Sequence, residues 1–489
     1  MKGNDALDAD IYFGNEVLFD IPIDIDIPKN GFGEILVRIN SDNKELHKMA
    51  GHGSFTFLVK RYTIDHNLVG TIKSEGVRIY NRTFNTTGIK NTIIIEGRAD
   101  HLLYKNFRGV VDSNSHVVGD FMSENVDELT FYLSNSSIVL PRIRPHVDFH
   151  GNVKIDKSQF KEFITPCGKE IKFEKYYKYK EHDGTIELHP YQVAIIKSIS
   201  GEPVSLGGEK STFIDVIEST LQLVSFVEGR RVAWSSWEYK CKDMMVKYLR
   251  GNVLSSTEET YSVDDAIIDK KYLNEFLRKT FYNFHCGNYK SAIIGAIGSL
   301  NSVKTMPVET YFMSLFQSLE SIVLTYRKMN GTEFVLDKKE WSLIKGVIEG
   351  AIRNNKELML AKSNRAQLYC KLNDLNRIPF QKAFIDFSSE INFLSSSPWP
   401  LFKNEDKIGL VSIRNMLAHG DYFPDELLNP LFVAGECLKL ILQEIIFKVI
   451  GWELSKKNNV AEAKPNVKFY PEYINECIGM MTNHITKRN

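Results

Sequence analysis

The sequence has few cysteines and no closely spaced pair of them, no excess charge of either sign and no long uninterrupted apolar run. Its six cysteines lie far apart and form no Cys-x-x-Cys pair, which argues against a disulfide framework and against a zinc cluster. Lysine plus arginine and aspartate plus glutamate number 61 each, so no overall field directs the protein to nucleic acid or to a membrane. A site for a polyanion must therefore be local.

The most apolar segment, LFVAGECLKLILQEIIFKVIGW, is interrupted by glutamate, lysine and glutamine residues. It predicts a buried or dimer-forming helix rather than a membrane span. The first residues, MKGNDALDADIYFG, have no apolar run behind their single lysine, so we expect no signal peptide. Together with the dispersed cysteines, this predicts a cytoplasmic protein without a membrane partner.

Two different hydrophobic periods divide the chain. From about residue 10 to 190, short segments such as GEILVRI, NTIIIEG and ELTFYL alternate apolar and polar residues between turn-forming residues, which predicts an antiparallel sandwich or barrel. After residue 261 nearly every segment has an apolar stripe at helical spacing, which predicts an α-helical bundle. The expected fold class is therefore α+β, with a β-rich domain at 1–190 and a helical domain with a C-terminal tail at 261–489.

The interval 191–260 is expected to extend the β-rich half. It contains STFIDVIESTLQLVSFVEG, whose apolar residues recur at helical spacing, so one or two helices are predicted to cover the strands. The polar stretch LSSTEETYSVDD, residues 254–265, is the best candidate for a linker between the halves.

The segment SIRNMLAHGDYF, residues 412–423, places an arginine, an amide and an imidazole within six positions. We predict a helix over residues 405–419 that ends there. Asn415 and His419 are four apart and share a face, and the long side chain of Arg414 can reach back along the surface. Gly420 then takes the left-handed position beyond the helix end. The apolar side of this helix is predicted to comprise Ile408, Leu410, Ile413 and Leu417.

These side chains match the needs of RNA cleavage without a metal. A ribose 2′-hydroxyl must lose a proton as it attacks the phosphorus, and the leaving 5′-oxygen must gain one. His419 can transfer protons, Arg414 can stabilise the extra phosphate charge, and Asn415 can hold one ring nitrogen. One imidazole cannot easily act on both sides of one phosphorus, so a two-fold dimer would supply the second. No cluster of metal ligands is visible, and we expect neither a metal nor a cofactor.

The same segment also has a purely structural interpretation. Histidine commonly ends helices, Gly420 is explained as a helix cap, and Arg414 can pair with Glu405 or Asp421. Spacing alone does not decide, because arginine precedes histidine at a similar distance in three other places. These are Arg61 and His66, Arg144 and His150, and Arg278 and His285. Only the pair at 278 and 285 shares one face of a predicted helix, and it remains the internal rival.

Three further features bear weakly on a site. Glu320, an acid among apolar helix residues, can orient Arg414 from a neighbouring helix, although an ordinary exposed glutamate is the more common case. Tyr422 and Phe423 can stack on an unpaired base or can cover the end of the bundle. Residues 321–382 contain twelve lysines and arginines against six acids, which fits a track for phosphates or a solvated helical surface.

The segment IRNMLAHG resembles the Arg-Asn-x3-His signature of HEPN domains, which usually ends a late helix of an α-bundle. Arg414, Asn415 and His419 match that signature residue for residue, whereas Arg278 is followed by Lys279. The order of a β-rich half, the helical STFIDVIESTLQLVSFVEGRRV and a C-terminal bundle is similar to that of the ApeA family of abortive-infection proteins.

This resemblance implies a ribonuclease that dimerises through its HEPN bundle and acts on host RNA during phage infection, commonly on tRNA or another structured RNA. It implies Arg414 and His419 as the catalytic pair, with Asn415 in support. The β-rich half would sense a phage-derived trigger or restrain the nuclease. The alternative is a HEPN-like dimer that binds RNA or a protein without cutting.

Overall fold

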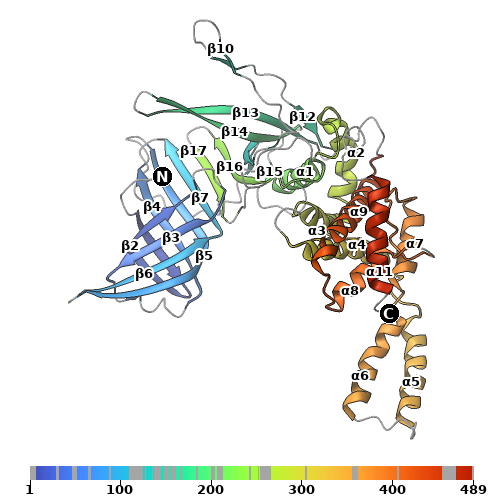
Figure 1. Ribbon diagram of the computed structural model, residues 1–489. Coiled ribbons are helices and arrows are strands. Elements are labelled where there is room, and N and C mark those ends of the chain that lie inside the picture. The colour runs from blue at the N-terminus through green and yellow to red at the C-terminus, as the bar shows by residue number, and fades with distance from the viewer. Residues whose placement is uncertain are drawn as a thin grey trace. The chain divides into compact units, whose positions relative to one another are not determined.

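The chain divides into two compact units, Met1–Phe281 and Tyr282–Asn489. The first is built mainly of strands and the second of helices, so the expected α+β class is confirmed (Figure 1). The computed structural model describes residues 7–28, 32–43, 45–46, 52–63, 68–87, 90–108, 125–126, 128–134, 136, 145–147, 153–155, 161–165, 168–182, 185–199, 204–205, 213–241, 244–251, 253, 266–302, 306–354, 362–404, 407–453 and 470–486.

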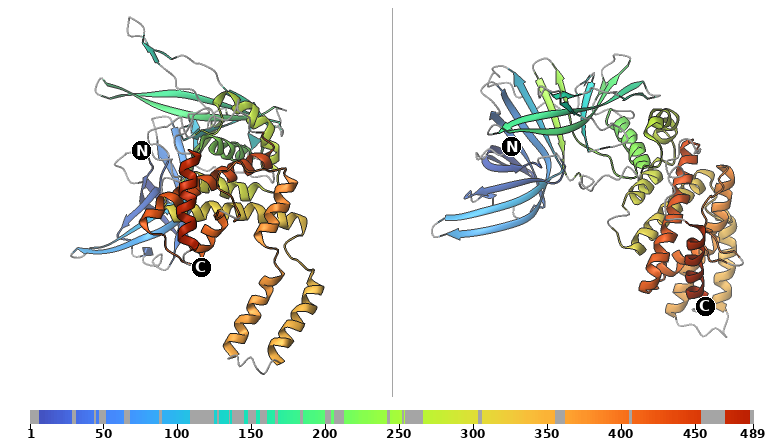
Figure 2. Two further views of the ribbon diagram at one scale, coloured as in Figure 1. Left: turned by 45° about the vertical axis from the view of Figure 1, so that its right-hand side comes forward. Right: turned by 45° about the horizontal axis from the view of Figure 1, so that its top comes forward.

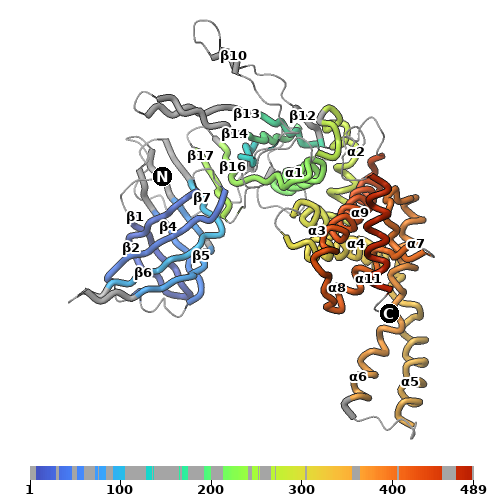
Figure 3. The backbone as a smooth tube through the Cα atoms, in the orientation of Figure 1, coloured from blue at the N-terminus to red at the C-terminus, as the bar shows by residue number. Residues whose placement is uncertain are grey.

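The first six strands form a closed antiparallel barrel, drawn in blue in Figure 3. Hydrogen-bonded neighbours follow the order β5-β4-β1-β2-β3-β6, and β6 pairs again with β5. Closure therefore joins the two edges of this sheet to each other. The six strands are β1 (Leu7–Phe13), β2 (Glu16–Asp26), β3 (Ile35–Ser41), β4 (Ser54–Thr63), β5 (Leu68–Thr87) and β6 (Lys90–Ala99).

The interior of the barrel is a packed apolar core. Along β3, Ile35, Val37 and Ile39 are buried, whereas Arg38 and Asn40, which point to the other side, are exposed. This alternation is the two-residue period of a strand with one face inward. All six strands contribute buried apolar side chains to one cluster, which fills the interior as expected for a small barrel.

Strand β5 is long enough to pair along different parts of its length with a barrel strand and with a strand outside the barrel. Its first part, Leu68–Lys73, pairs with β7 (His101–Arg108), and its last part, Val77–Thr87, pairs with β6. From β7 the sheet continues away from the barrel in the order β17-β16-β9-β14-β13-β12. These strands are β17 (Met244–Arg250), β16 (Trp234–Cys241), β9 (Glu128–Leu133), β14 (Thr185–Ser198), β13 (Lys169–His182) and β12 (Lys161–Ile164). Two small pairs join β8 (Asn125–Val126) to β15 (Val204–Ser205) and β10 (Pro145–Val147) to β11 (Val153–Ile155).

Helix α1 (Phe213–Glu228) packs against β13 and β14. Its last residue, Glu228, is buried and accepts hydrogen bonds from Ser136 Oγ at 2.5 Å and from Arg230 Nε at 2.6 Å. Ser136 N–H in turn donates to Gln192 Oε1 of β14 at 2.8 Å. The buried carboxylate is thus paired, as a buried charge must be, and the pairing fixes the end of α1 beside the sheet.

In the described part of the interval 191–260, helix α1 is followed by the strands β16 and β17, which pair with each other and with β9 and β7. The predicted linker at residues 254–265 lies outside the described residues. The boundary between the compact units falls within α2 (Leu273–His285), which follows the short 3-10 helix η3 (Lys270–Tyr272).

The second unit is built around its two longest helices, α4 (Val308–Asn330) and α9 (Asp425–Ile450), which pack together. Helices α3, α7 and α8 contact α4, and α11 contacts α9. Their bounds are α3 (Lys290–Leu300), α5 (Lys338–Asn354), α6 (Lys362–Leu372), η5 (Asn373–Asn376), α7 (Phe380–Glu390), α8 (Leu410–Ala418) and α11 (Pro471–Thr486).

The contact between α4 and α9 explains the most apolar segment of the sequence. A side chain at Gly435 would place its Cβ 3.3 Å from the ring of Tyr311, so glycine lets the helices approach closely there. The Tyr311 hydroxyl donates a hydrogen bond to Glu436 Oε1 at 3.2 Å, and burial next to this acid raises the pKa of Tyr311. The segment predicted as buried or dimer-forming is α9, which is buried along its length. None of the described helices is both long and apolar enough to cross a bilayer.

Candidate functional site

The helix that carries the Arg-Asn-x3-His segment is shorter than predicted. Helix α8 begins at Leu410, not at residue 405, because the chain before it folds back on itself. The N–H groups of Leu410 and Val411 donate to the carbonyls of Pro400 and Leu401, both at 3.0 Å. A Cβ on Gly409 would lie 2.4 Å from the backbone of Phe402. The helix therefore starts where only glycine allows this approach.

The expected apolar side of α8 changes accordingly. Leu410 and Ile413 are buried on the helix, and Leu417 is half-buried. Ile408 is buried as well, but it precedes the helix, and its carbonyl accepts a hydrogen bond from Trp399 Nε1 at 3.2 Å. The prediction that Ile408 lies on the helix was wrong, because hydrophobic spacing does not reveal a backbone turn at Gly409.

The C-terminal end of α8 has the geometry that the sequence predicted. Gly420 has φ of +82°, the left-handed region, and no atom lies within 4 Å of the position of a Cβ there. Its N–H donates to Leu417 O at 3.1 Å, and Asp421 N–H donates to Met416 O at 3.1 Å. This pair of bonds is a Schellman motif. It makes His419 the C-cap residue, and the His419 side chain is exposed.

Arg414 is held on three sides by neighbouring groups. Its Nη2 forms an ion pair with Glu320 Oε1 at 2.9 Å, its guanidinium carbon lies 5.8 Å from the centre of the Phe316 ring, and its Nη1 donates to Asn415 Oδ1 at 3.2 Å. The Nε–H is covered and has no partner among the described residues. About a third of the side chain, 33%, remains exposed. The guanidinium is thus oriented by its surroundings and still reachable from solvent.

Glu320 contacts Arg414 from α4, in the position in which it can orient the guanidinium. Phe316 lies one turn before it on the same helix, so the pair presents an aromatic face and a carboxylate at four-residue spacing. Both contacts hold the guanidinium in place. Sequence reasoning gave Glu320 little weight and missed Phe316. The available signal was an acid within an apolar helical stripe, with an aromatic residue four positions earlier.

The other predicted residues are placed differently from one another. Asn415 is exposed, and its amide oxygen accepts from Arg414; no hydrogen bond joins Asn415 to the His419 ring among the described residues. Tyr422 is 67% exposed, and its hydroxyl donates to Asp425 Oδ1 at 3.4 Å. Phe423 is fully buried against the ring of His484, with centroids 5.8 Å apart. Of the two aromatic residues, Tyr422 is accessible from solvent, and Phe423 belongs to the packed interior.

The rival pair lies on α2. Arg278 is exposed and His285 is half-buried at the helix end. Seven residues of α-helix separate them by roughly 10 Å along the axis. The neighbouring Lys279 Nζ forms an ion pair with Glu275 Oε1 of the same helix at 2.8 Å.

Other chemistry has little support in the described part of the chain. No group of three or more histidine, cysteine, aspartate or glutamate residues there is arranged to hold a metal ion. Burial raises the pKa of the Cys437 thiol to about 12, so this thiol stays protonated and is a poor nucleophile.

The geometry at α8 combines a capped helix end, an exposed imidazole and an oriented guanidinium within six residues. A permanently charged fork suits a phosphate, and an imidazole in water suits proton transfer. No family model, curated protein or solved structure matches this chain.

Proposed function

We propose that this protein is an endoribonuclease that cleaves RNA without a metal ion, and that Arg414 and His419 are its catalytic residues. The observation that carries the proposal is the arrangement of Arg414, whose guanidinium contacts Glu320 and Phe316 while about a third of the side chain stays exposed. His419 supports it, because its side chain is exposed at a helix end fixed by Gly420.

The chemistry follows from these two groups. An imidazole removes the proton of a ribose 2′-hydroxyl, and the oxygen attacks the adjacent phosphorus. The guanidinium stabilises the added negative charge on the phosphoryl oxygens. The bond from phosphorus to the 5′-oxygen then breaks, and an imidazolium gives that oxygen a proton. The products are a 2′,3′-cyclic phosphate and a 5′-hydroxyl.

The proposed enzyme is a homodimer formed by the helical unit. Proton removal and proton donation occur on opposite sides of one phosphorus, and one His419 cannot easily serve both. A two-fold axis near the end of α8 would bring a second His419 to the same phosphodiester, because an isologous contact places the same residue on both sides. Tyr422, which is exposed just beyond the motif, would stack on a base next to the scissile bond.

The biological role rests on the resemblance to HEPN and ApeA proteins. We propose a cytoplasmic antiphage enzyme that cleaves host RNA, such as tRNA, when infection is sensed. The β-rich unit would restrain the nuclease or recognise a phage-derived trigger. Asn415 would support Arg414 through the hydrogen bond between the two side chains.

The second candidate is a dimer that binds RNA or a protein without cutting. One observation favours it: the amide of Asn415 is bonded to Arg414 and not to the imidazole, so nothing among the described contacts fixes the orientation of the His419 ring. In such a protein Arg414 would bind phosphate, and His419 would serve only as a helix cap.

Cleavage by the purified full-length protein separates these candidates. Wild type and His419→Ala are incubated with total tRNA, and folding, dimerisation and RNA affinity are measured in parallel. If the protein is a ribonuclease, wild type should cleave the tRNA and His419→Ala should not, while folding, dimerisation and RNA affinity are the same in both. Equal cleavage by both proteins would remove His419 from the mechanism, and tight RNA binding without cleavage by wild type would establish the second candidate.

A further inference from the structure

Helices α5 and α6 form a hairpin that extends beyond the other helices of the second unit (Figures 1 and 2). Helix α5 contains no buried residue. The base of the hairpin is fixed by Asn376, which is only 5% exposed. Its carbonyl accepts from Val335 N–H and its side-chain oxygen accepts from Leu336 N–H, both at 2.8 Å. The hairpin is therefore anchored at one end and solvated along its length.

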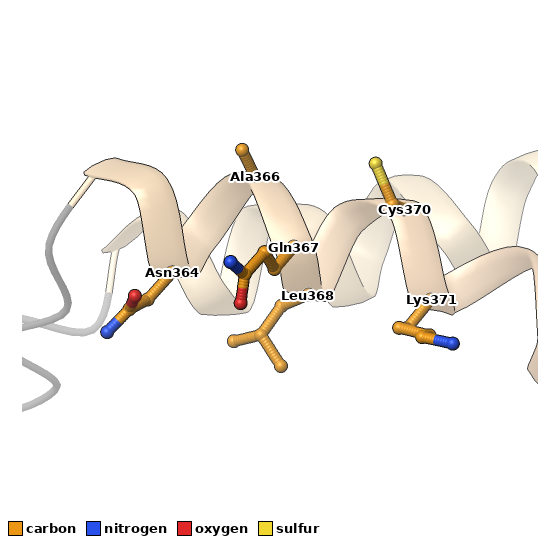
Figure 4. Close-up of a pocket in the computed structure, with 6 residues that line it drawn as sticks. All are labelled: Asn364, Ala366, Gln367, Leu368, Cys370 and Lys371. Carbon is orange, nitrogen blue, oxygen red and sulfur yellow. The ribbon is translucent and has the colours of Figure 1, made fainter.

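Helix α5 has a half-buried face and an exposed face. Six residues of α5 are half-buried, and four of them, Trp341, Lys345, Ile348 and Ile352, lie at the three- and four-residue spacing of one helix face. Lys345 Nζ from this face donates to Asn373 Oδ1 at 3.0 Å. On α6 the residues Asn364, Ala366, Gln367, Leu368, Cys370 and Lys371 line an open pocket, and Leu368 and Lys371 point to one side of the helix (Figure 4).

The exposed face of α5 is strongly apolar. Leu343 is 75% exposed and Val347, one turn later, is 73% exposed. Residues 334–375 contain seven of the 21 large apolar side chains that are exposed in the described part of the chain. Four of them lie on α5 and α6, and the other three lie at the base of the hairpin. Such a concentration of exposed apolar residues marks an interaction surface rather than scattered exposure. The seven are Phe334, Val335, Leu343, Ile344, Val347, Leu368 and Leu375.

The hairpin is also basic within a neutral protein. Helix α5 has four basic and two acidic residues, and α6 has three basic residues and no acid. One of the two acids, Glu349, already lies 3.8 Å from Lys345. Lys338, Lys339 and Arg353 form no ion pair with any described residue. The second acid, Glu340, is exposed three residues before Leu343. The two helices together still carry a net positive charge, which favours an acidic occupant.

We propose that the α5–α6 hairpin binds an acidic amphipathic helix of another protein. Two copies of the hairpin would bring their positive charges together, which opposes self-association. A phosphate backbone would satisfy the lysines and leave Leu343 and Val347 in water. An acidic helix with apolar residues three and four apart satisfies both features at once. This inference does not depend on the ribonuclease activity.

The test uses the full-length protein and a synthetic helical peptide of about 18 residues. The peptide carries leucines at three- and four-residue spacing on one face and glutamates elsewhere. A second peptide has the same composition with its leucine positions scrambled. Binding is measured by fluorescence anisotropy for wild type, two double variants and two controls. One double variant combines Leu343→Ser and Val347→Ser. The other combines Lys338→Glu and Lys339→Glu. The controls are Leu394→Ser, at a leucine that is 93% exposed elsewhere, and Lys403→Glu.

We expect wild type to bind the patterned peptide at least tenfold more tightly than the scrambled one. Each double variant should lose at least tenfold in affinity, and both controls should match wild type. Because the substituted side chains are exposed, circular dichroism should be unchanged. Equal affinity for the two peptides would overturn the proposal.

Two further outcomes would replace it. Loss of RNA-oligonucleotide binding in the lysine variant, without peptide binding by wild type, would make the hairpin an RNA surface. Dissociation of a dimer by the Leu343 and Val347 changes, measured by sedimentation, would make it a contact between copies of this chain.

Discussion

Two helices of this protein, α2 and α8, each carry an arginine followed by a histidine near the helix end, and they differ in what surrounds the arginine. Arg278 on α2 is exposed. Arg414 on α8 contacts a carboxylate, an aromatic ring and an amide, and keeps a third of its surface free. Catalysis requires groups whose orientation is fixed before the substrate arrives. The side chains around each arginine therefore distinguish the two arginine–histidine pairs better than the spacing of the pairs does.

The largest effect should distinguish the two histidines. His419→Ala is expected to lower the cleavage rate by roughly 10²–10⁴-fold, the range typical of general acid–base groups. His285→Ala should leave the rate within about twofold of wild type, since no described contact connects it with Arg414. Both are measured as initial rates on the same RNA. If His285→Ala were inactive and His419→Ala were active, His285 and not His419 would be the catalytic histidine.

The next effect concerns the two arginines. Arg414→Lys keeps the charge but replaces a planar fork by a single ammonium group, and it should lower the cleavage rate by roughly 10²-fold. Arg278→Lys is the matched control and should change little. If Arg414→Lys retained full activity, a point charge would suffice and the oriented guanidinium would have no role in catalysis.

A smaller effect is expected at Glu320, which positions Arg414. Glu320→Gln removes a negative charge next to the guanidinium, so RNA should bind as well or better and KM should not rise. The fork should be less well oriented, and kcat should fall roughly tenfold. Glu309→Gln, elsewhere on α4, is the control. A rise in KM with unchanged kcat would show that Glu320 does not act through the orientation of Arg414.

The helix cap should affect stability more than chemistry. Gly420 has φ of +82°, so Gly420→Ala is expected to reduce the free energy of unfolding by roughly 1 kcal/mol. Gly295→Ala, within α3 at an open position, should instead raise it by up to about 1 kcal/mol. Urea titration followed by circular dichroism measures both. Equal effects of the two substitutions would mean that the left-handed position does not strain an alanine.

The smallest expected effect is that of removing metal ions. Cleavage in the presence of EDTA should equal cleavage without it, because the proposed steps use only imidazole and guanidinium groups. Loss of activity in EDTA with recovery on adding magnesium would contradict this chemistry, provided that the RNA substrate keeps its fold, which a melting curve checks.

Much of the fold could be predicted from the sequence, because hydrophobic period reports which face of an element is buried. The change from a two-residue to a helical period separated the strands from the bundle. The hairpin of β16 and β17 was not predicted, since its pairing with β9 and β7 depends on strands distant in the sequence. The start of α8 was also missed, because the close approach at Gly409 involves backbone at Leu401 and Phe402 that periodicity does not describe.

The site could be predicted mainly along its own helix, and from the neighbouring helix only Glu320 was proposed, with little weight. Arg414, Asn415 and His419 are neighbours in sequence, and the cap at Gly420 follows from local rules. Glu320 and Phe316 precede Arg414 by more than ninety residues, and only the packing of α4 against α8 brings them to it. The exposed face of α5 was counted as part of a basic stretch, but the exposure of Leu343 and Val347 required the structure.

The most direct measurement of the central claim is the chemistry of RNA ends in cells that express the protein. RNA from cells with wild type and with His419→Ala is sequenced after ligation that selects 2′,3′-cyclic phosphates or 5′-hydroxyls. The proposed mechanism predicts new ends of both kinds at matching positions in wild type and none in the variant. Ends with 3′-hydroxyls and 5′-phosphates, or identical profiles in the two strains, would contradict it.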